Sequence, residues 1–315
     1  MLLVGAFRNK LNCSLKMQGK ITVRNCDPQD TRDAAAYERL KAGAVFAHLV
    51  SRPGYEVSKN LFFAEVDGVI IGYANVLPEP GIGRVIIEYD VDSSYRSEVV
   101  LEKLFGRAMK RASDVGARVA HASIPATDLA GAELLSNLGF KVVRRFHELR
   151  LDISVANLEA VEPSGVAYRH LGAGEKELLA WIENSCFTGT WGFNSNTAEY
   201  ITWELSARGD RPDDVILALS ECRPVGYCWT ESECGRDSST GRSKGRVYML
   251  GVDTDYRGRD LGRKLLRAGL LHLKSKGREL IDITVDSQNI AAVTLYRSLG
   301  FQLHGETVWY EKAVP

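Results

Sequence analysis

The segment that decides the fold is YMLGVDTDYRGRDLGRKLLRAGLLHLKSK, residues 248–276. Its beginning belongs to an apolar run that predicts a strand over 246–253, and the glycine-containing turn after it predicts a chain reversal. The rest predicts a helix over 260–276, because its leucines recur on one helical face: Leu261, Leu265, Leu266, Leu270 and Leu273. A strand, a tight turn and an amphipathic helix in this order are typical of layered α/β folds.

An earlier part of the chain repeats this segment. Residues 89–140 align with residues 250–301 without a gap, at a constant offset of 161 (250 − 89), and the two segments share 12 identical residues in 52. Average residue usage would give about 3 identities over this length. The sequence therefore predicts a tandem duplication.

The flanking patterns agree with the duplication. In the first half, 21–25 predicts a strand and 29–50 a helix, and 61–77 predicts a hairpin that turns at Asp67-Gly68, a strong two-residue turn signal. The remainder of this half continues as strand, helix, strand, helix, strand.

The second half has the same order of elements. We predict a strand over 166–171, a helix over 175–187, and a hairpin over 215–232 that turns near Arg223-Pro224. The elements after it are predicted at 246–253, 260–276, 280–285, 288–299 and 301–311. The alternation of strands and helices predicts an α/β architecture in both halves.

Composition and length limit the possible functions. The chain has 315 residues, which predicts two domains, and its 40 basic and 40 acidic residues give a formal net charge of zero. Nucleic-acid-binding proteins usually have a basic excess, so we expect no nucleic-acid partner. No run approaches the ~18 apolar residues of a membrane span, so we expect no membrane association. The six cysteines lack CxxC spacing, and we therefore expect reduced thiols, no metal site and a cytoplasmic location.

The turn RGRDLG, residues 257–262, is the sharpest motif. Backbone N–H groups at the start of a helix lack helical partners, and the helix dipole adds partial positive charge there, so such a junction binds anions. Gly258 and Gly262 allow a phosphate to approach the backbone closely. Three arginines add positive charge: Arg257, Arg259 and Arg263. We predict that this turn binds a diphosphate.

This turn resembles the acetyl-CoA pyrophosphate loop of the GNAT superfamily, whose pattern is Q/R-x-x-G-x-G/A. Arg257 stands at the first position, Asp260 at that of the first glycine and Gly262 at the last. Asp260 departs from the pattern, and Gly258 supplies compensating backbone freedom.

A second segment, NIAAVTLYRSLGF (289–301), is similar to the superfamily pattern N-x-x-A-x-x-L-Y-x-x-x-G-F. The matching residues are Asn289, Ala292, Leu295, Tyr296, Gly300 and Phe301. Asn289 and Tyr296 are two helical turns apart on one face, about 10 Å along the axis. This spacing suits an extended ligand that is held at one point and reacts at another.

The resemblance covers nearly the whole chain as a tandem pair, and CFTGTWGFNSNTAEY (186–200) extends it to the mycothiol synthases. It implies two GNAT folds, each with a mixed, mostly antiparallel central sheet flanked by helices. We place an extension at 1–19, a first domain at 20–155 and a second at 164–315, with the linker within 152–166. It also implies an N-acetyltransferase that takes acetyl-CoA as co-substrate and a primary amine as acceptor.

The resemblance also implies site residues in the second domain. Acetyl-CoA is expected to contact the end of the strand, the turn with the first residues of the helix, and the later helix: Leu250, Gly251 and Val252; Arg257, Gly258, Arg259, Asp260, Leu261, Gly262 and Arg263; Asn289, Ala292 and Tyr296. Tyr296 is the expected proton donor to the departing thiolate, because a phenol with a pKa near 10 stays protonated at neutral pH. The backbone N–H of Leu250 or Val252 is expected to stabilise the negative charge on the carbonyl oxygen.

The general base is the least defined part of the site. Mycothiol synthases have a glutamate in a Gly-Glu-Val-Tyr segment before the strand, and this chain has Arg246 there. Glu231 is therefore our candidate, acting through a water molecule, with Glu233 and His304 as alternatives, although both glutamates also suit a solvated loop.

The first half has lost the corresponding groups. Leu135 stands where the second half has Tyr296, and a leucine cannot donate a proton. Glu98 and Glu102 replace Arg259 and Arg263 and would repel a diphosphate. We expect a first domain that keeps the fold and is catalytically degenerate.

Three functions stay open at this point. The chain acetylates a small-molecule amine, or it acetylates a protein or peptide, or it is a non-catalytic acyl-CoA-binding regulatory module. In the second case the acidic stretch Asp210, Asp213 and Asp214 would select an acceptor with positive charge. The acceptor pocket is expected within 184–210, where three aromatic residues line it or close the core beneath it: Trp191, Phe193 and Trp203. We expect a monomer or a homodimer.

Overall fold

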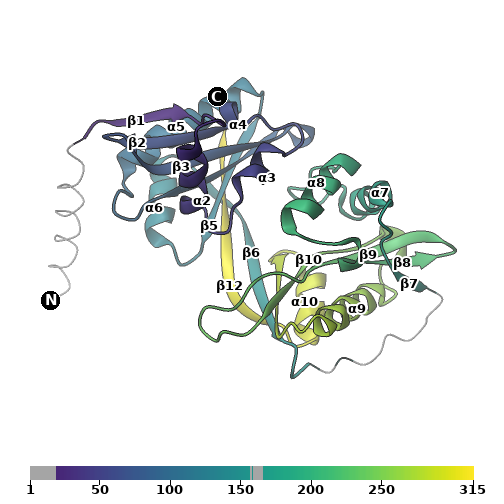
Figure 1. Ribbon diagram of the computed structural model, residues 1–315. Helices are drawn as coiled ribbons and strands as arrows, with labels where there is room; N and C mark the ends of the chain where they lie inside the picture. Colours follow the sequence, from purple (N-terminus) through teal and green to yellow (C-terminus); the bar gives the residue numbers. More distant parts are fainter. Residues whose placement is uncertain (1–18, 157, 159–165) are drawn as a thin grey trace. The chain divides into compact units, whose positions relative to one another are not determined.

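The repeat in the sequence corresponds to two sets of strands and helices in the computed structural model, which describes residues 19–156, 158 and 166–315 (Figure 1). All but the last residue of the predicted extension 1–19 lies outside the described residues, and so does much of the predicted linker 152–166. None of the helices in the described ranges is long and apolar enough to cross a membrane.

The first half of the chain alternates short helices with strands. Its elements in chain order are β1 (Ile21–Asn25), α2 (Thr31–Leu40), α3 (Phe46–Val50), α4 (Val57–Asn60), β2 (Leu61–Val66), β3 (Val69–Glu79), η1 (Pro80–Ile82), β4 (Arg84–Val91), α5 (Glu98–Asp114), β5 (Val119–Pro125), α6 (Leu129–Asn137) and β6 (Lys141–Asp152).

The second half follows the same plan. Its elements are β7 (Ala167–His170), α7 (Lys176–Phe187), α8 (Ala198–Arg208), η2 (Pro212–Asp214), β8 (Val215–Ser220), β9 (Arg223–Glu231), β10 (Lys244–Val252), η3 (Thr254–Tyr256), α9 (Leu261–Ser275), β11 (Leu280–Asp286), α10 (Ile290–Ser298) and β12 (Gln302–Ala313).

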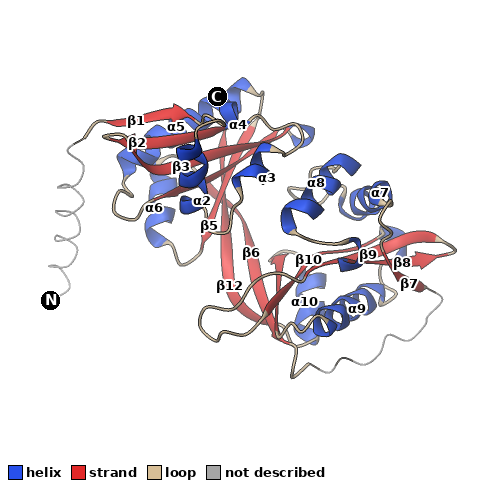
Figure 2. Ribbon diagram, viewed as in Figure 1, coloured by secondary structure: helices blue, strands red, loops and turns tan. Residues whose placement is uncertain are grey.

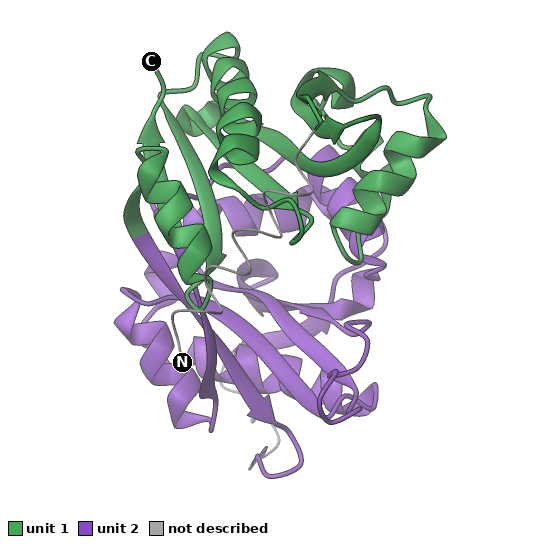
Figure 3. Cartoon of the chain, turned by 90° about the vertical axis from the view of Figure 1, so that its left-hand side faces the viewer, with its two compact units in different colours: residues 1–143, 309–315 green, residues 144–308 purple. Residues whose placement is uncertain are grey.

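The structure divides into two compact units, coloured separately in Figure 3. The first unit runs to Val143 and also contains Trp309–Pro315, and the second is Arg144–Val308. These limits differ from the sequence division at 155 and 164, because the last strand of each half pairs outside its own repeat. Residues 146–152 of β6 pair antiparallel with β11, and β12 ends in the first unit beside β5.

Each unit has a mixed, mostly antiparallel sheet flanked by helices, as expected for the fold class (Figure 2). In the first unit β1, β2, β3 and β4 pair antiparallel in that order, and β4 pairs parallel with β5. In the second unit β7, β8, β9 and β10 pair antiparallel, β10 pairs parallel with β11, and β11 pairs antiparallel with β6.

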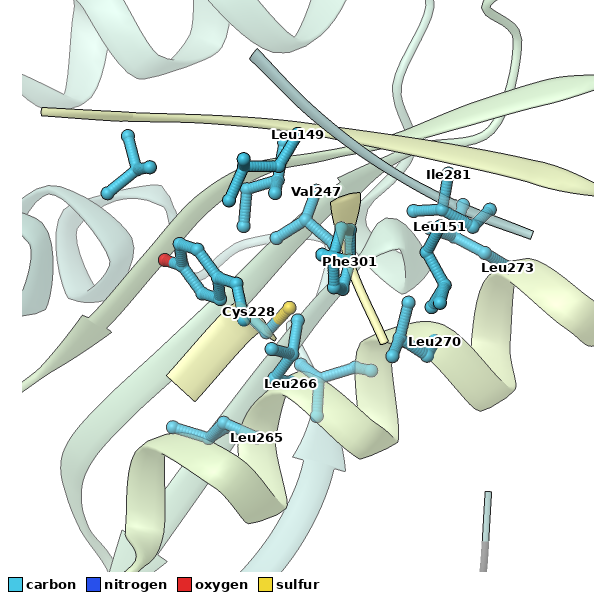
Figure 4. Close-up of a cluster of buried hydrophobic side chains, with 14 of the residues drawn as sticks. Leu149, Leu151, Cys228, Val247, Leu265, Leu266, Leu270, Leu273, Ile281 and Phe301 are labelled. Carbon is cyan, nitrogen blue, oxygen red and sulfur yellow. The ribbon is translucent and has the colours of Figure 1, made fainter. Parts of the chain in front are cut away.

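Two apolar clusters hold the second unit together, one on each face of its sheet. The leucine face of α9 packs with strand residues on one side, and Figure 4 shows the centre of this cluster around Leu266, Leu270 and Phe301. The helices α7 and α8 cover the opposite face through residues such as Leu179 and Ile201. Burying each of these side chains contributes roughly 1.5–3 kcal/mol, so the sheet is firmly placed between the two helix layers.

Two local predictions differ from the structure. The predicted helix 29–50 is broken between α2 and α3, where Gly43 adopts a φ of 78°. The second hairpin turns at Glu221-Cys222 rather than near Arg223-Pro224, and the proline lies in β9 beside a register shift. A strand tolerates proline at such a bulge, because the regular ladder of hydrogen bonds is already interrupted.

The helix α8 was not predicted at all. Its apolar positions give a weak pattern, but Thr197 caps its start by accepting a hydrogen bond from Tyr200 N at 3.1 Å, and Gly209 ends it with a φ of 71°. These two residues are the signals that could have located it.

Candidate active site

Two neighbouring strands of the second unit separate part of the way along their length. The parallel pairing of β10 with β11 covers only Lys244–Val247 and Leu280–Ile283, and a register shift follows at Val247/Met249 in the pairing of β10 with β9. From this point β10 stays paired with β9, and β11 stays paired with β6. The backbone of β10 after Val247 is therefore released on the side that β11 has left.

Two backbone N–H groups point toward this opening. Asp253 N donates to Val225 O at 3.0 Å, so this N–H points toward β9. Because successive residues of a strand point their N–H groups to opposite sides, those of Val252 and Leu250 point away from β9. The expected donor to a carbonyl oxyanion is one of these two groups, the N–H of Leu250 or that of Val252.

The turn after β10 leaves the start of α9 without a side-chain cap. Gly258 has a φ of 75° and Asp260, the N-cap residue, a φ of 60°, a left-handed conformation that glycine adopts without strain. The side chain of Asp260 accepts no capping hydrogen bond, so the first N–H groups of α9 keep their capacity to bind an anion.

A cavity of about 550 Å³ joins these features, and a volume of this size suits a small organic ligand. Every residue predicted to contact acetyl-CoA lines it except Arg259. Further lining residues come from α7, the turn, and α10: Cys186, Phe187, Thr190, Tyr256, Ala291 and Leu295.

The three arginines of the turn have different roles. Arg257 is committed to the fold, because its guanidinium donates to Val252 O at 3.0 Å and Cys186 O at 2.8 Å and so ties the turn to α7. Arg259 donates to Asp255 O and lies over the ring of Tyr256, outside the cavity lining. Arg263 lines the cavity and contacts the carboxylate of Asp260 at 3.1 Å. The prediction that Arg259 lies at the ligand site is therefore not supported by its position.

Tyr296 lies on α10, and Asn289 is the N-cap residue at the start of that helix. Tyr296 is 6% exposed, lines the cavity, and packs its ring against Phe301. Its hydroxyl has no hydrogen-bond partner among the described residues, and burial raises its pKa above the usual value, so it keeps its proton at physiological pH. Asn289 caps α10 by accepting a hydrogen bond from Ala292 N at 3.1 Å, which fixes the position of the helix that carries Tyr296.

The candidate bases lie outside the cavity lining. Glu231 forms an ion pair with Arg208 at the end of β9, where it stands opposite Arg246 in the strand register. Glu233 and His304 are exposed. The structure therefore does not bring Glu231 to the cavity, because the guanidinium of Arg208 holds its carboxylate elsewhere.

The remaining acceptor-side candidates also have partners of their own. Phe193 packs against Phe187 with ring centroids 5.6 Å apart, whereas Trp191 and Trp203 contact Phe146 and Tyr200. The acidic stretch is paired within its unit: Asp210 accepts from Trp229, Asp213 from Lys276 and Asp214 from His272. Because these three carboxylates already have partners, the arrangement does not favour the hypothesis that they select a cationic acceptor.

Two residues of α7 at the cavity fall in the range 184–210, where the acceptor pocket is expected, although the sequence singles out neither of them. Cys186 and Phe187 line the cavity from a helix that precedes the turn by about 70 residues. Gly251 is the signal that could have indicated a close neighbour, because a Cβ built there would lie 2.9 Å from Cys186 Cβ and 2.7 Å from Tyr227 Cε1.

The chain belongs to the acetyltransferase (GNAT) family and is an N-acetyltransferase. The family model matches residues 176–301, which contain β10, the uncapped start of α9 and Tyr296. A mycothiol acetyltransferase of Actinosynnema mirum is 31% identical over 84% of this chain and 86% of its own length. A mycothiol acetyltransferase of Gordonia bronchialis is 32% identical over 76% of this chain and 77% of its own.

Solved structures support the same fold. A GCN5-related N-acetyltransferase from Sphaerobacter thermophilus has a TM-score of 0.70 at 19% identity and covers 93% of this chain and 96% of its own. A tandem GNAT protein from the clavulanic acid biosynthesis pathway also has a TM-score of 0.70, at 14% identity, over 94% of this chain and 99% of its own. The fold of both halves of the chain is thus shared with proteins of low sequence identity.

Proposed function

We propose that the second unit transfers the acetyl group of acetyl-CoA to the primary amine of a small molecule by direct attack on the thioester. The observation that carries this proposal is the cavity in which the uncapped start of α9, the outward N–H groups of β10 and the buried phenol of Tyr296 meet. Membership of the acetyltransferase (GNAT) family supports acetyl-CoA as the co-substrate.

Each part of the cavity suits one part of acetyl-CoA. The N–H groups at the start of α9, with Arg263 beside them, suit the diphosphate. The released edge of β10 offers backbone groups to the extended pantetheine arm. The phenol of Tyr296 then lies at the reacting end of the cavity.

The reaction needs three groups from the protein. The amine nitrogen forms a bond to the carbonyl carbon, and the N–H groups of Leu250 and Val252 donate to the oxygen on which negative charge develops. The carbon–sulfur bond then breaks, and Tyr296 donates its proton to the departing thiolate. The amine also loses a proton, and the predicted base Glu231 lies outside the cavity lining.

We further propose that the first half is catalytically degenerate. Leu135, at the position that corresponds to Tyr296, is fully buried and has no ionisable group. Asp128, at the position that corresponds to Asn289, contacts Arg96 in the turn before α5. The basic residue of that turn is therefore engaged by a carboxylate of its own unit.

The first acceptor to test is the free-amine precursor of mycothiol, because the similar proteins are named mycothiol acetyltransferases. The assay follows release of CoA thiol with this precursor, cysteine, glucosamine and a lysine-containing peptide. We expect acetylation of a small amine to exceed acetylation of the peptide. Absence of turnover with every amine, or a clear preference for the peptide, would contradict the proposal.

We predict that Asp260→Gly binds acetyl-CoA more tightly than the wild type. Glycine adopts a φ of 60° without strain, and the substitution removes a negative charge beside the proposed diphosphate and releases Arg263. Because the carboxylate is 57% exposed, solvent screens it, and we expect a decrease of about fivefold in Kd by calorimetric titration.

Glu221→Gly is the matched control for this substitution. Glu221 also has a positive φ, 50°, and is exposed in the turn between β8 and β9, outside the cavity lining. It should leave the affinity for acetyl-CoA unchanged. Weaker binding by Asp260→Gly would show that the carboxylate supports the loop rather than opposing the ligand.

A further inference from the structure

The first unit has a second kind of cavity, which we call the basic cavity. It has a volume of about 200 Å³ and lies where α5 packs on β1 and β2 with α4 beside them (Figure 1). Its lining includes four basic side chains and one carboxylate: Lys59, Arg107, Lys110, Arg111 and Asp114. Lys59 is paired with Glu56 at 2.7 Å, so the positive charge that remains comes from α5.

Three of these cations share one face of α5. Lys110 and Arg111 follow Arg107 by three and four residues, a spacing at which helical side chains are neighbours and like charges repel each other. Within the described ranges, none of the three forms an ion pair with a carboxylate. The sequence therefore gathers positive charge here at a cost to the helix, which indicates a role other than stabilising the fold.

Neutral side chains hold the two guanidinium groups in place. Arg107 Nη2 donates to Asn25 Oδ1 at 2.7 Å, and its guanidinium lies over the ring of Phe62, 5.5 Å from the centroid. Arg111 Nε donates to Asn60 Oδ1 at 2.8 Å, and Asn60 is only 2% exposed. A carboxamide fixes a guanidinium without neutralising it, so both positive charges stay available to a ligand.

The duplication supplies a matched cavity in the second half of the chain. At the offset of 161, the three cations of α5 correspond to Ala268, Leu271 and His272 of α9, which also line a cavity. Each cavity is lined as well by the last residue of the first strand of its half, Asn25 in β1 and His170 in β7, and by the residue paired with it in the next strand. Corresponding elements thus form both cavities, and only the first has arginine and lysine at these three helix positions.

The helix of the second cavity contacts a buried carboxylate, whereas α5 contacts an amide. His272 Nε2 lies 3.0 Å from Asp214 Oδ1, and Asp214 is 2% exposed. Asp214 and Asn60 correspond, because each lies two residues before the strand residue that lines its cavity. The first half thus keeps the contact between helix and loop but replaces the carboxylate beside Arg111. Since the fold accommodates a carboxylate at this position, its replacement leaves the charge of Arg111 free for a ligand.

We propose that the basic cavity binds a phosphate group, free or carried by a small molecule, through Arg107, Lys110 and Arg111. A guanidinium presents its N–H groups in a planar fork that matches phosphate oxygens, and an ammonium adds a point charge. A phosphate monoester carries about −1.5 to −2 charges at pH 7, so it suits three cations better than a carboxylate does. The volume is below the about 300–1,000 Å³ of pockets that enclose drug-sized ligands, so the cavity suits the phosphate group and leaves the rest of a ligand outside. This inference does not depend on the acetyl transfer proposed above.

The test titrates inorganic phosphate and glycerol 3-phosphate into the full chain by calorimetry at low ionic strength. Acetyl-CoA is present in excess, so that the proposed diphosphate site at the start of α9 is filled. We expect binding that weakens as salt is added, because salt screens exposed charges. Arg111→Gln should raise the Kd by about tenfold or more, since a charge-assisted hydrogen bond to phosphate is lost. Equal affinity for the two probes would identify free phosphate as the ligand, and tighter binding of glycerol 3-phosphate would identify a phosphorylated small molecule.

Asn60→Asp separates ligand binding from a structural role of the cations. It introduces the carboxylate that the second half has at Asp214, so the new charge should pair with Arg111 and compete with the ligand. We expect the Kd for phosphate to rise by about tenfold while the Tm equals or exceeds that of the wild type. Lys141→Gln removes an exposed cation of the same unit outside the cavity lining and should bind phosphate as the wild type does.

Several results would overturn the inference. One is a wild type that binds neither probe at millimolar concentrations, and another is binding that survives unchanged in both Arg111→Gln and Asn60→Asp. Loss of affinity together with a lower Tm in both variants would assign the residues to the fold. Binding of a short single-stranded RNA that is lost in Asn60→Asp, without binding of either probe, would assign the cavity to a nucleic acid instead. A wild type that binds phosphate but acetylates no amine would overturn the proposed function alone.

Discussion

Acetyl-CoA binding is expected to fall by about 100-fold or more in Gly262→Glu, measured by calorimetric titration. Gly262 is in the first turn of α9, and a Cβ built on it would lie 3.6 Å from Leu295 Cδ2 and 3.7 Å from Val252 Cγ2, both ordinary contacts. Leu295 and Val252 line the cavity, so the new carboxylate would project into the proposed diphosphate site. Two like charges about 4 Å apart at a partly buried site repel by roughly 4 kcal/mol.

The substituted protein should fold normally. A glutamate in the first turn of a helix interacts favourably with the helix dipole, and no neighbouring atom has to move to admit its Cβ. We therefore expect the Tm of Gly262→Glu to equal that of the wild type or to exceed it slightly.

Two control variants isolate the effect of charge. Gly262→Ala adds the Cβ alone and should retain most of the affinity. Gly106→Glu adds the same side chain to an exposed position of α5 with no atom within 4 Å of its Cβ, and it should bind acetyl-CoA as the wild type does. Binding that survives in Gly262→Glu would place acetyl-CoA in the first unit instead.

Tyr296→Phe is expected to lower kcat by a factor between about 10² and 10⁴, the range typical of a lost general acid. Tyr296 lines the cavity and its hydroxyl has no partner in the described part of the chain, so phenylalanine keeps the packing against Phe301 and leaves no group unsatisfied. The Kd for acetyl-CoA and the Tm should therefore stay close to the wild-type values.

Tyr168→Phe is the matched control for this prediction. Tyr168 packs on the same apolar cluster as Tyr296, and its buried hydroxyl also lacks a hydrogen-bond partner among the described residues, but it lies outside the cavity lining. It should keep full activity. Equal kcat values for Tyr296→Phe and the wild type would remove Tyr296 from the chemistry and leave it a packing residue.

The structure changes the view of how protons move in this site. Arg246 occupies the place where mycothiol synthases have a glutamate, and the nearby Glu231 is held by Arg208. The predicted base thus lies at the end of β9, outside the cavity lining, while the expected acid Tyr296 lines the cavity from α10.

The sequence by itself determined the duplication, the class of fold and the ligand-facing turn. These features depend on residues that are neighbours along the chain: the apolar run of β10, the leucine spacing of α9 and the interval from Asn289 to Tyr296. Local periodicity fixes which face of a strand or helix is apolar, and a positive φ or an uncapped helix start depends on a few adjacent residues. The predicted turn residues therefore line the cavity almost without exception.

Only the tertiary structure decided which distant groups meet. Arg257 binds a carbonyl 71 residues away and is thereby used for the fold. Cys186 and Tyr227 both come against Gly251 because α7 packs on β9. The sequence also did not predict that β6 pairs with β11 or that β12 ends in the first unit. The residues of a strand do not identify the strand that it will pair with. Such contacts are set by how whole elements pack, and periodicity within one element contains no information about its neighbours.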